Sequence, residues 1–127
     1  MPRIGDLAPD FSATTTHGPI KFSEWRQGKW AVLFSHPADF TPVCSTELTE
    51  LGRMNDQFEK RGVRLIGISV DSIHSHLAWV ENLTRILQVK LPFPLIADGN
   101  RAVAEKYGMI HPQESETVTV RALFVID

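Results

Sequence analysis

Residues 30–47 read WAVLFSHPADFTPVCSTE and contain the single cysteine of the chain. The first five residues form an apolar run bounded by Gly28, which is typical of a buried strand. From Leu48 to Arg61, apolar residues recur at intervals of three and four, which predicts a helix. A strand followed directly by a helix indicates the layered α/β class. The connection between the two elements carries two prolines and the candidate reactive residue.

This connection places Cys44 in the first turn of the predicted helix. The hydroxyl of Thr41 suits an N-cap, Pro42 then falls at N1, and Cys44 falls at N3. A free cysteine thiol has a pKa of about 8.5, and the positive end of a helix favours its thiolate. Cys44 is therefore a candidate nucleophile. Its spacing with Leu48 and Leu51 is equally consistent with a buried structural cysteine.

Length and composition indicate one globular domain over residues 1–127. The chain is 43% hydrophobic and 22% charged, with a formal net charge of −2, so no nucleic-acid partner is expected. It lacks an apolar run of about 18 residues, so no membrane partner is expected. The N-terminus lacks the apolar segment of a signal peptide, and one cysteine cannot form an internal disulfide. A reducing cytoplasm is the expected compartment.

Strand and helix patterns alternate along the rest of the chain. A hairpin is expected over residues 10–23, further strands over 64–70, 94–97 and 118–127, and helices over 75–87 and 101–107. The spacing of the helix over 75–87 predicts an inward face of Leu77, Val80, Leu83 or Thr84, and Leu87. This alternation predicts an α/β fold with a largely parallel sheet.

The motif Pro37-x-x-x-Thr41-x-x-Cys44 resembles the active-site motif of the peroxiredoxins, the AhpC/TSA family. Residues 35–48 are similar to its one-cysteine, peroxiredoxin 6-type branch and the archaeal relatives of that branch. Further similar segments follow in order, namely GDxAPDF at 5–11, SVDS at 69–72, SHxAW at 75–79, AD at 97–98, VAxxYGM at 103–109 and TVRAxFVID at 119–127. A single motif would be a modest signal, whereas this ordered set spans almost the whole chain.

The resemblance implies a thioredoxin-like fold, with a central mixed, largely parallel sheet flanked by helices and an N-terminal β-hairpin. It implies a thiol-dependent peroxidase that reduces hydrogen peroxide and organic hydroperoxides through a cysteine sulfenic acid, with no metal and no other cofactor. Besides the peroxide, the expected partner is an external thiol reductant of the thioredoxin or glutathione type, because Cys44 has no internal partner. A homo-oligomer is expected if the family interfaces are present.

By the same resemblance, Cys44 would be the peroxidatic nucleophile and Thr41 would hydrogen-bond the peroxide or the thiolate. Pro37 would shield the sulfur from water. Arg121 would stabilise the thiolate and the charge that develops on oxygen, as preorganised cationic donors do. Glu47 would orient Arg121.

Each of these residues also has an ordinary structural explanation. Thr41 could be only an N-cap, and Pro37 only a loop residue. Arg121 could lie at an exposed strand end. Glu47 could be a first-turn glutamate that the helix dipole favours.

The histidines offer competing interpretations. His36 near Cys44 could suggest a cysteine hydrolase, but the sequence shows no second orienting group, so His36 is expected to line the pocket. His74 and His76 are two residues apart and lie on different helix faces, which argues against a metal site. Trp79 is expected to pack behind the active site. Neither a zinc-ligand spacing, nor a G-x-S-x-G motif, nor a Gly-rich phosphate loop is present.

Members of the family continue for several dozen residues beyond the strand that ends at Asp127. The C-terminal strand, helix and arm of the family are therefore expected to be absent from residues 1–127. A long hydrophobic strand left exposed would promote aggregation. The alternative to a peroxidase is a non-enzymatic thioredoxin-like redox sensor, holdase or binding module.

Overall fold

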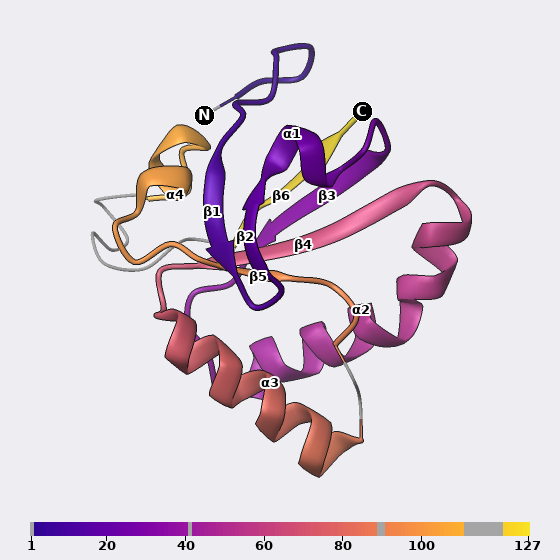
Figure 1. Ribbon diagram of the computed structural model, residues 1–127, viewed down its shortest axis with the longest axis vertical. Helices are drawn as coiled ribbons and strands as arrows, with labels where there is room; N and C mark the ends of the chain where they lie inside the picture. Colours follow the sequence, from indigo (N-terminus) through magenta and orange to yellow (C-terminus); the bar gives the residue numbers. More distant parts are fainter. Residues whose placement is uncertain (1, 41, 89–90, 111–120) are drawn as a thin grey trace.

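The computed structural model describes residues 2–40, 42–88, 91–110 and 121–127. The strands are β1 Ser12–Thr15, β2 Gly18–Lys21, β3 Trp30–Ser35, β4 Val63–Ser69, β5 Leu95–Ala97 and β6 Leu123–Ile126. The helices are α1 Phe22–Trp25, α2 Pro42–Lys60, α3 Ile73–Leu87 and α4 Ala102–Lys106. The two long helices α2 and α3 lie on one side of the sheet, and α1 and α4 lie on the other, as Figure 1 shows.

Within these residues the strands form one six-stranded sheet in the order β2-β1-β5-β4-β3-β6. The central pairs β3–β4 and β4–β5 are parallel. The pairs β1–β2, β1–β5 and β3–β6 are antiparallel. The expectation of a mixed sheet with an N-terminal hairpin is confirmed, but "largely parallel" is wrong outside the centre. The hairpin and β6 join the sheet antiparallel, because neither enters it through a strand–helix–strand crossover of the kind that makes β3, β4 and β5 parallel.

The central strands are apolar on both faces because two cores cover them. Ala31 and Leu33 of β3 belong to the core on the α4 side, together with Tyr107. Val32 and Phe34 belong to the core under α2 and α3. Alternate side chains of a strand point to opposite faces, so one apolar run supplies both cores. The sequence pattern of the Trp30–Ser35 strand is thereby explained.

The helix α3 shows a different inward face from the one that its leucines predict. Leu77 is 47% exposed, whereas His76, Trp79 and Leu83 are buried. The ring of His76 is held by hydrogen bonds to Asp39 and to the carbonyl of Ile96. These polar contacts turn His76 inward and leave Leu77 at the surface.

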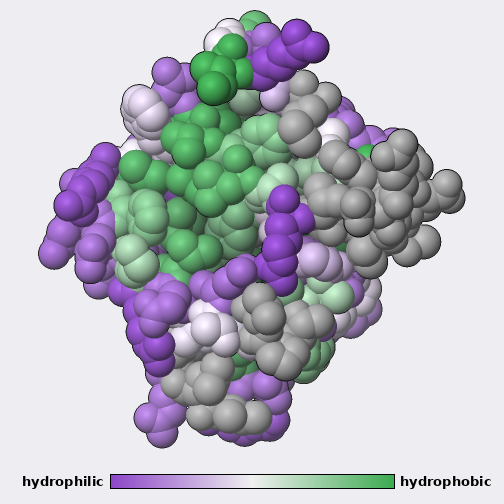
Figure 2. Space-filling model, turned by 180° about the vertical axis from the view of Figure 1, so that it is seen from behind, coloured by the Kyte–Doolittle hydropathy of each residue, from purple (hydrophilic) through white to green (hydrophobic). Residues whose placement is uncertain are grey.

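The strand β6 lies at the edge of the sheet beside β3. The predicted strand over 118–127 is present from Leu123 onward, and residues 118–120 lie outside the described residues. Leu123 and Val125 are more than half exposed, as are Ile4 and Leu7 of the N-terminal segment. The face turned to the viewer in Figure 2 carries a broad apolar area.

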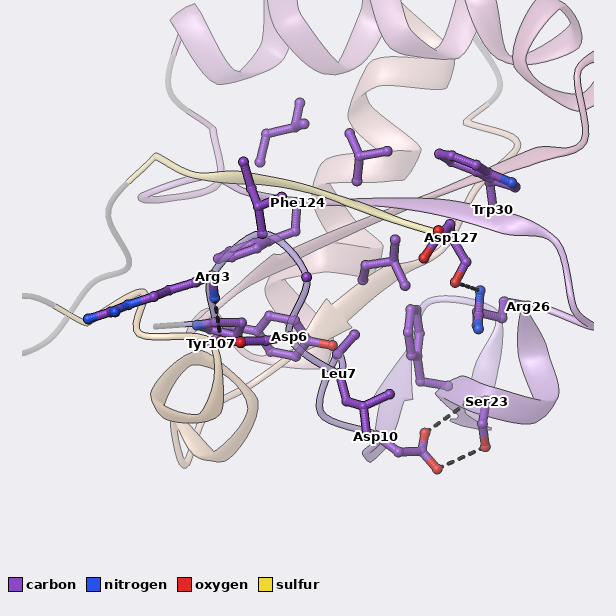
Figure 3. Close-up of a pocket in the computed structure, with 18 residues that line it drawn as sticks. Arg3, Asp6, Leu7, Asp10, Ser23, Arg26, Trp30, Tyr107, Phe124 and Asp127 are labelled. Atoms are coloured by element: carbon purple, nitrogen blue, oxygen red, sulfur yellow. Dashed lines mark hydrogen bonds between the residues drawn. The ribbon is translucent and has the colours of Figure 1, made fainter.

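A hollow of about 970 Å³ lies between the N-terminal segment and β6. Arg3, Asp6, Tyr107, Phe124 and Asp127 are among its lining residues (Figure 3). Its lining does not include Cys44, so it is distinct from the candidate active site described below. Across the part of the chain that the structure describes, none of the helices is long and apolar enough to cross a membrane.

Candidate active site

Cys44 is the third residue of α2, as the sequence predicts, and its side chain is completely buried. It packs with Leu48 and Trp79 in the core under the sheet. The indole N–H of Trp79 donates to Oγ of Ser45 at 3.1 Å, next to the cysteine. The expectation that Trp79 backs this site is therefore confirmed. Thr41, the predicted N-cap and catalytic hydroxyl, lies outside the described residues.

Arg121 reaches this buried thiol from the other end of the sequence. Its Nη2 donates to Sγ of Cys44 at 3.3 Å, and its Nη1 donates to Oε2 of Glu47 at 2.6 Å. Burial alone would lower the pKa of Arg121, but the hydrogen bond and charge of Cys44 and the carboxylate of Glu47 outweigh it and raise that pKa. A fixed guanidinium of this kind can stabilise a thiolate and an oxygen anion that forms beside it.

The position of Arg121 follows from two hydrogen bonds between Ser35, at the end of β3, and Ala122, the residue after the arginine. We call this pair of hydrogen bonds the clamp. Ser35 donates its backbone N–H to the carbonyl of Ala122 at 2.9 Å. The backbone N–H of Ala122 donates to Oγ of Ser35 at 2.8 Å. Ser35 therefore fixes the start of β6 against the end of β3, beside the first turn of α2. The guanidinium is brought to Cys44 by this local pairing.

Glu47 lies one turn after Cys44, so both residues project from the same side of α2. The predicted contact between Glu47 and Arg121 is present, and the two side chains are 51% and 43% exposed. The pair forms the solvent-facing part of the site, whereas Cys44 forms its buried part. These two contacts together orient the guanidinium beside the sulfur.

Pro37 and His36 lie in the loop between β3 and α2. Pro37 is half-buried there. His36 is buried, packs 5.1 Å from the ring of Trp79, and donates from Nε2 to Oδ1 of Asp39 at 2.8 Å. The sequence-based statement that His36 has no orienting group is therefore wrong, because Asp39 orients it from three residues away.

Asp39 is the residue of this site that sequence reasoning missed. Its carboxylate accepts hydrogen bonds from His36, His76 and Ser75. Burial would raise the pKa of Asp39, but these hydrogen bonds and the charge of His76 hold it well below its usual range. The sequence did contain an indication of this contact, because Asp39 follows His36 by three residues in the quoted motif.

Four side chains here have the composition of a metal site. His36, Asp39, Asp71 and His76 offer ligand atoms within 4.8 Å of one another. The prediction that His74 and His76 lie on different faces of the helix is confirmed, since His76 is buried and His74 is exposed. Hydrogen bonds already engage both carboxylate oxygens of Asp39 and both ring nitrogens of His76, and they account for the closeness of the group.

Residues 4–127 match the family described as AhpC/TSA. The chain belongs to the AhpC/TSA family. Among curated relatives, a peroxiredoxin of Aquifex aeolicus (strain VF5) is 58% identical over 127 residues, which cover 100% of this chain and 57% of the relative. A peroxiredoxin 2 of Caldanaerobacter subterraneus subsp. tengcongensis is 55% identical with the same coverage. The chain thus spans little more than half the length of these AhpC/TSA relatives.

Solved structures agree with this family assignment. A yeast mitochondrial 1-Cys peroxiredoxin superposes with a TM-score of 0.91 at 43% identity, covering 100% of this chain and 63% of that one. A peroxiredoxin 6 of Arenicola marina gives a TM-score of 0.87 at 44% identity, covering 96% and 58%. The predicted thioredoxin-like fold and the resemblance to one-cysteine AhpC/TSA proteins are confirmed.

Proposed function

We propose that residues 1–127 carry the peroxide-reducing centre of a thiol-dependent peroxidase. The observation that carries the proposal is the 3.3 Å hydrogen bond from Arg121 to the sulfur of Cys44. A structural cysteine needs no cationic donor, whereas an attacking thiolate does. The similarity to proteins named peroxiredoxins supports the same assignment.

In the proposed reaction the Cys44 thiolate attacks one oxygen of a hydroperoxide. An S–O bond forms and the O–O bond breaks, so the sulfur is oxidised by two electrons to a sulfenic acid. The leaving oxygen takes a proton and departs as water or an alcohol. Arg121 stabilises the sulfur anion before the attack and the oxygen charge during it.

The remaining candidates have supporting roles in this proposal. Glu47 holds the guanidinium of Arg121 in place. Thr41 hydrogen-bonds the peroxide, Pro37 shields the sulfur from water, and His36 lines the pocket. These roles rest on the motif and on the position of the loop between β3 and α2.

An external thiol would restore the cysteine. One thiol condenses with the sulfenic acid to give a mixed disulfide and water, and a second thiol releases Cys44 as its thiol together with an external disulfide. The yeast mitochondrial 1-Cys peroxiredoxin is described as resolved through glutathione and thioredoxin systems. We propose a reductant of that type, hydrogen peroxide or an organic hydroperoxide as substrate, a homo-oligomeric protein and a cytoplasmic location.

The test is the rate of Cys44 oxidation by hydrogen peroxide between about pH 4 and about pH 9, with a sulfenic-acid trap and mass spectrometry. The proposal expects a fast reaction that persists well below about pH 8, and no trapped product from Cys44→Ser. A slow reaction that rises only near the ordinary thiol pKa of about 8.5 would contradict it. That outcome would favour a non-enzymatic sensor, holdase or binding module.

A further inference from the structure

Asp39 is the centre of a buried hydrogen-bond network that the proposed chemistry does not use. Its side chain is 1% exposed. It accepts from Nε2 of His36 at 2.8 Å, from Nδ1 of His76 at 2.6 Å and from Oγ of Ser75 at 2.9 Å. Its backbone N–H donates to Oδ2 of Asp71 at 3.0 Å. Both the side chain and the backbone of this loop residue are therefore fixed.

The two ring nitrogens of His76 each face a hydrogen-bond acceptor. Nδ1 faces the carboxylate of Asp39, and Nε2 faces the carbonyl oxygen of Ile96 at 2.9 Å. A carboxylate and a carbonyl can only accept hydrogen bonds, so both ring nitrogens must donate. The ring is completely buried, so both hydrogen bonds are shielded from water. Asp39 and His76 thus form a buried ion pair between the loop and α3.

The ion pair holds a loop that is strained beside the reactive cysteine. Phe40, the neighbour of Asp39, has φ of 63°, which is the left-handed region that bulky residues rarely adopt. Such a conformation persists when the surroundings determine it. The loop leads directly into the first turn of α2, where Cys44 lies. A shift of this loop would move the cysteine relative to Arg121.

We infer that Asp39 and His76 are positioning residues for Cys44, because their mutual contact ties the loop before α2 to α3. The inference deepens the proposed peroxidase function and rests on it. A side chain at this position that cannot donate to both Asp39 and Ile96 leaves one of these acceptors without its partner, so the loop is held less firmly. Oxidation of Cys44 then slows.

The titratable neighbours of His76 come from two segments within the described residues. His36 and Asp39 face it from the loop before α2, and Asp71 faces it from the end of β4. The strand β5 presents the uncharged carbonyl of Ile96.

The first experiment compares His76→Gln with His74→Gln in the full chain. His74 is exposed two residues away on the same helix and is the matched control. The second-order rate constant for Cys44 oxidation by hydrogen peroxide is measured from about pH 5 to about pH 10. The wild type and His74→Gln should reach the same plateau, whereas His76→Gln should be about tenfold slower there. A plateau for His76→Gln within about twofold of the wild type would overturn the inference.

Two measurements keep the inference testable if His76→Gln does not fold. Imidazole ¹⁵N chemical shifts of the wild type at neutral pH should show both nitrogens of His76 protonated, and a neutral ring would overturn the inference. The backbone N–H of Asp39 should exchange with solvent faster in Asp39→Asn than in the wild type, and equal exchange would also overturn it. Slow peroxide oxidation of the wild type at every pH would instead contradict the proposed function, while the ¹⁵N shifts and the exchange still report whether the ion pair holds the loop.

Discussion

The guanidinium of Arg121 lies 3.3 Å from the sulfur of Cys44, although the two residues are 77 positions apart in the sequence. The same guanidinium bonds Glu47 at 2.6 Å, so its planar fork joins a buried sulfur to a half-exposed carboxylate. The rigid geometry of an arginine suits this double contact better than a lysine does. Three residues from two distant segments thus form one charged unit at the start of α2.

Replacing Arg121 should slow the oxidation of Cys44 by peroxide. Loss of one preorganised donor typically costs about 10²-fold to 10³-fold in rate, so we expect about 10²-fold for Arg121→Ala. Arg121→Lys should recover only part of this, because one ammonium cannot make both contacts. Stopped-flow measurement of the second-order rate constant checks the prediction.

Arg53→Ala is the matched control for this experiment. Arg53 lies on the same helix as Cys44 and pairs with Glu50 at 3.1 Å on an exposed surface. Its removal should leave the rate constant unchanged within about twofold, because exposed pairs contribute little. Equal slowing in Arg53→Ala and Arg121→Ala would mean that net charge, and not the contact with sulfur, controls the reaction.

Glu47→Gln should have a smaller effect than the loss of the arginine. The pair is half-exposed, so solvent screening limits its contribution to about 1 kcal/mol, or about fivefold in rate. The arginine remains beside Cys44 but is less firmly oriented. Glu50→Gln, on the same helix, is the control. A Glu47→Gln variant that is as slow as Arg121→Ala would show that the glutamate takes part in the chemistry directly.

Local sequence signals were sufficient to predict most elements of this fold. The apolar run before the motif became β3, and the proline at N1 correctly placed the start of α2. Gly108 has φ of 66°, which explains its place just after Tyr107, the C-cap of α4. These features depend on neighbours in the sequence, so the sequence alone contains their cause.

Contacts between distant segments could not be predicted in the same way. Leu77 was expected to face inward from helical spacing, but the ion pair of His76 with Asp39 turns the helix so that Leu77 is exposed. The antiparallel pairing of β6 with β3 likewise depends on a chain reversal that periodicity does not encode. The contact between Arg121 and Cys44 was expected only from the family resemblance, since it depends on that pairing.

Ser35→Ala should weaken the clamp that positions Arg121. The hydroxyl of Ser35 accepts the backbone N–H of Ala122 at 2.8 Å, and its loss leaves that donor unpaired in a half-buried site. We expect a loss of about 1 kcal/mol in the free energy of unfolding, measured with urea. We also expect slower Cys44 oxidation, because Arg121 precedes Ala122. The control is Ser23→Ala. It removes a hydroxyl that donates to Asp10 in the N-terminal part of the chain, so it should leave the oxidation rate unchanged.

Asp39 should make stability depend on acid pH in a definite direction. Its pKa in the folded protein lies below the ordinary value of 3.8, so its contribution to the free energy of unfolding is fully present above that pH and is lost as the pH falls further.

Removing one partner of a buried ion pair typically costs about 3 kcal/mol, so Asp39→Asn should be less stable than the wild type by about that much near neutrality. The gap in the free energy of unfolding should narrow as the pH falls below 3.8, because the unfolded wild type then binds a proton that the folded carboxylate does not, whereas the variant has no such proton to bind. Urea titrations of both proteins over this range measure the gap, with Asp56→Asn, an exposed position on α2, as the control. A gap that stays constant down to the acid limit would mean that Asp39 contributes through shape and not through its charge.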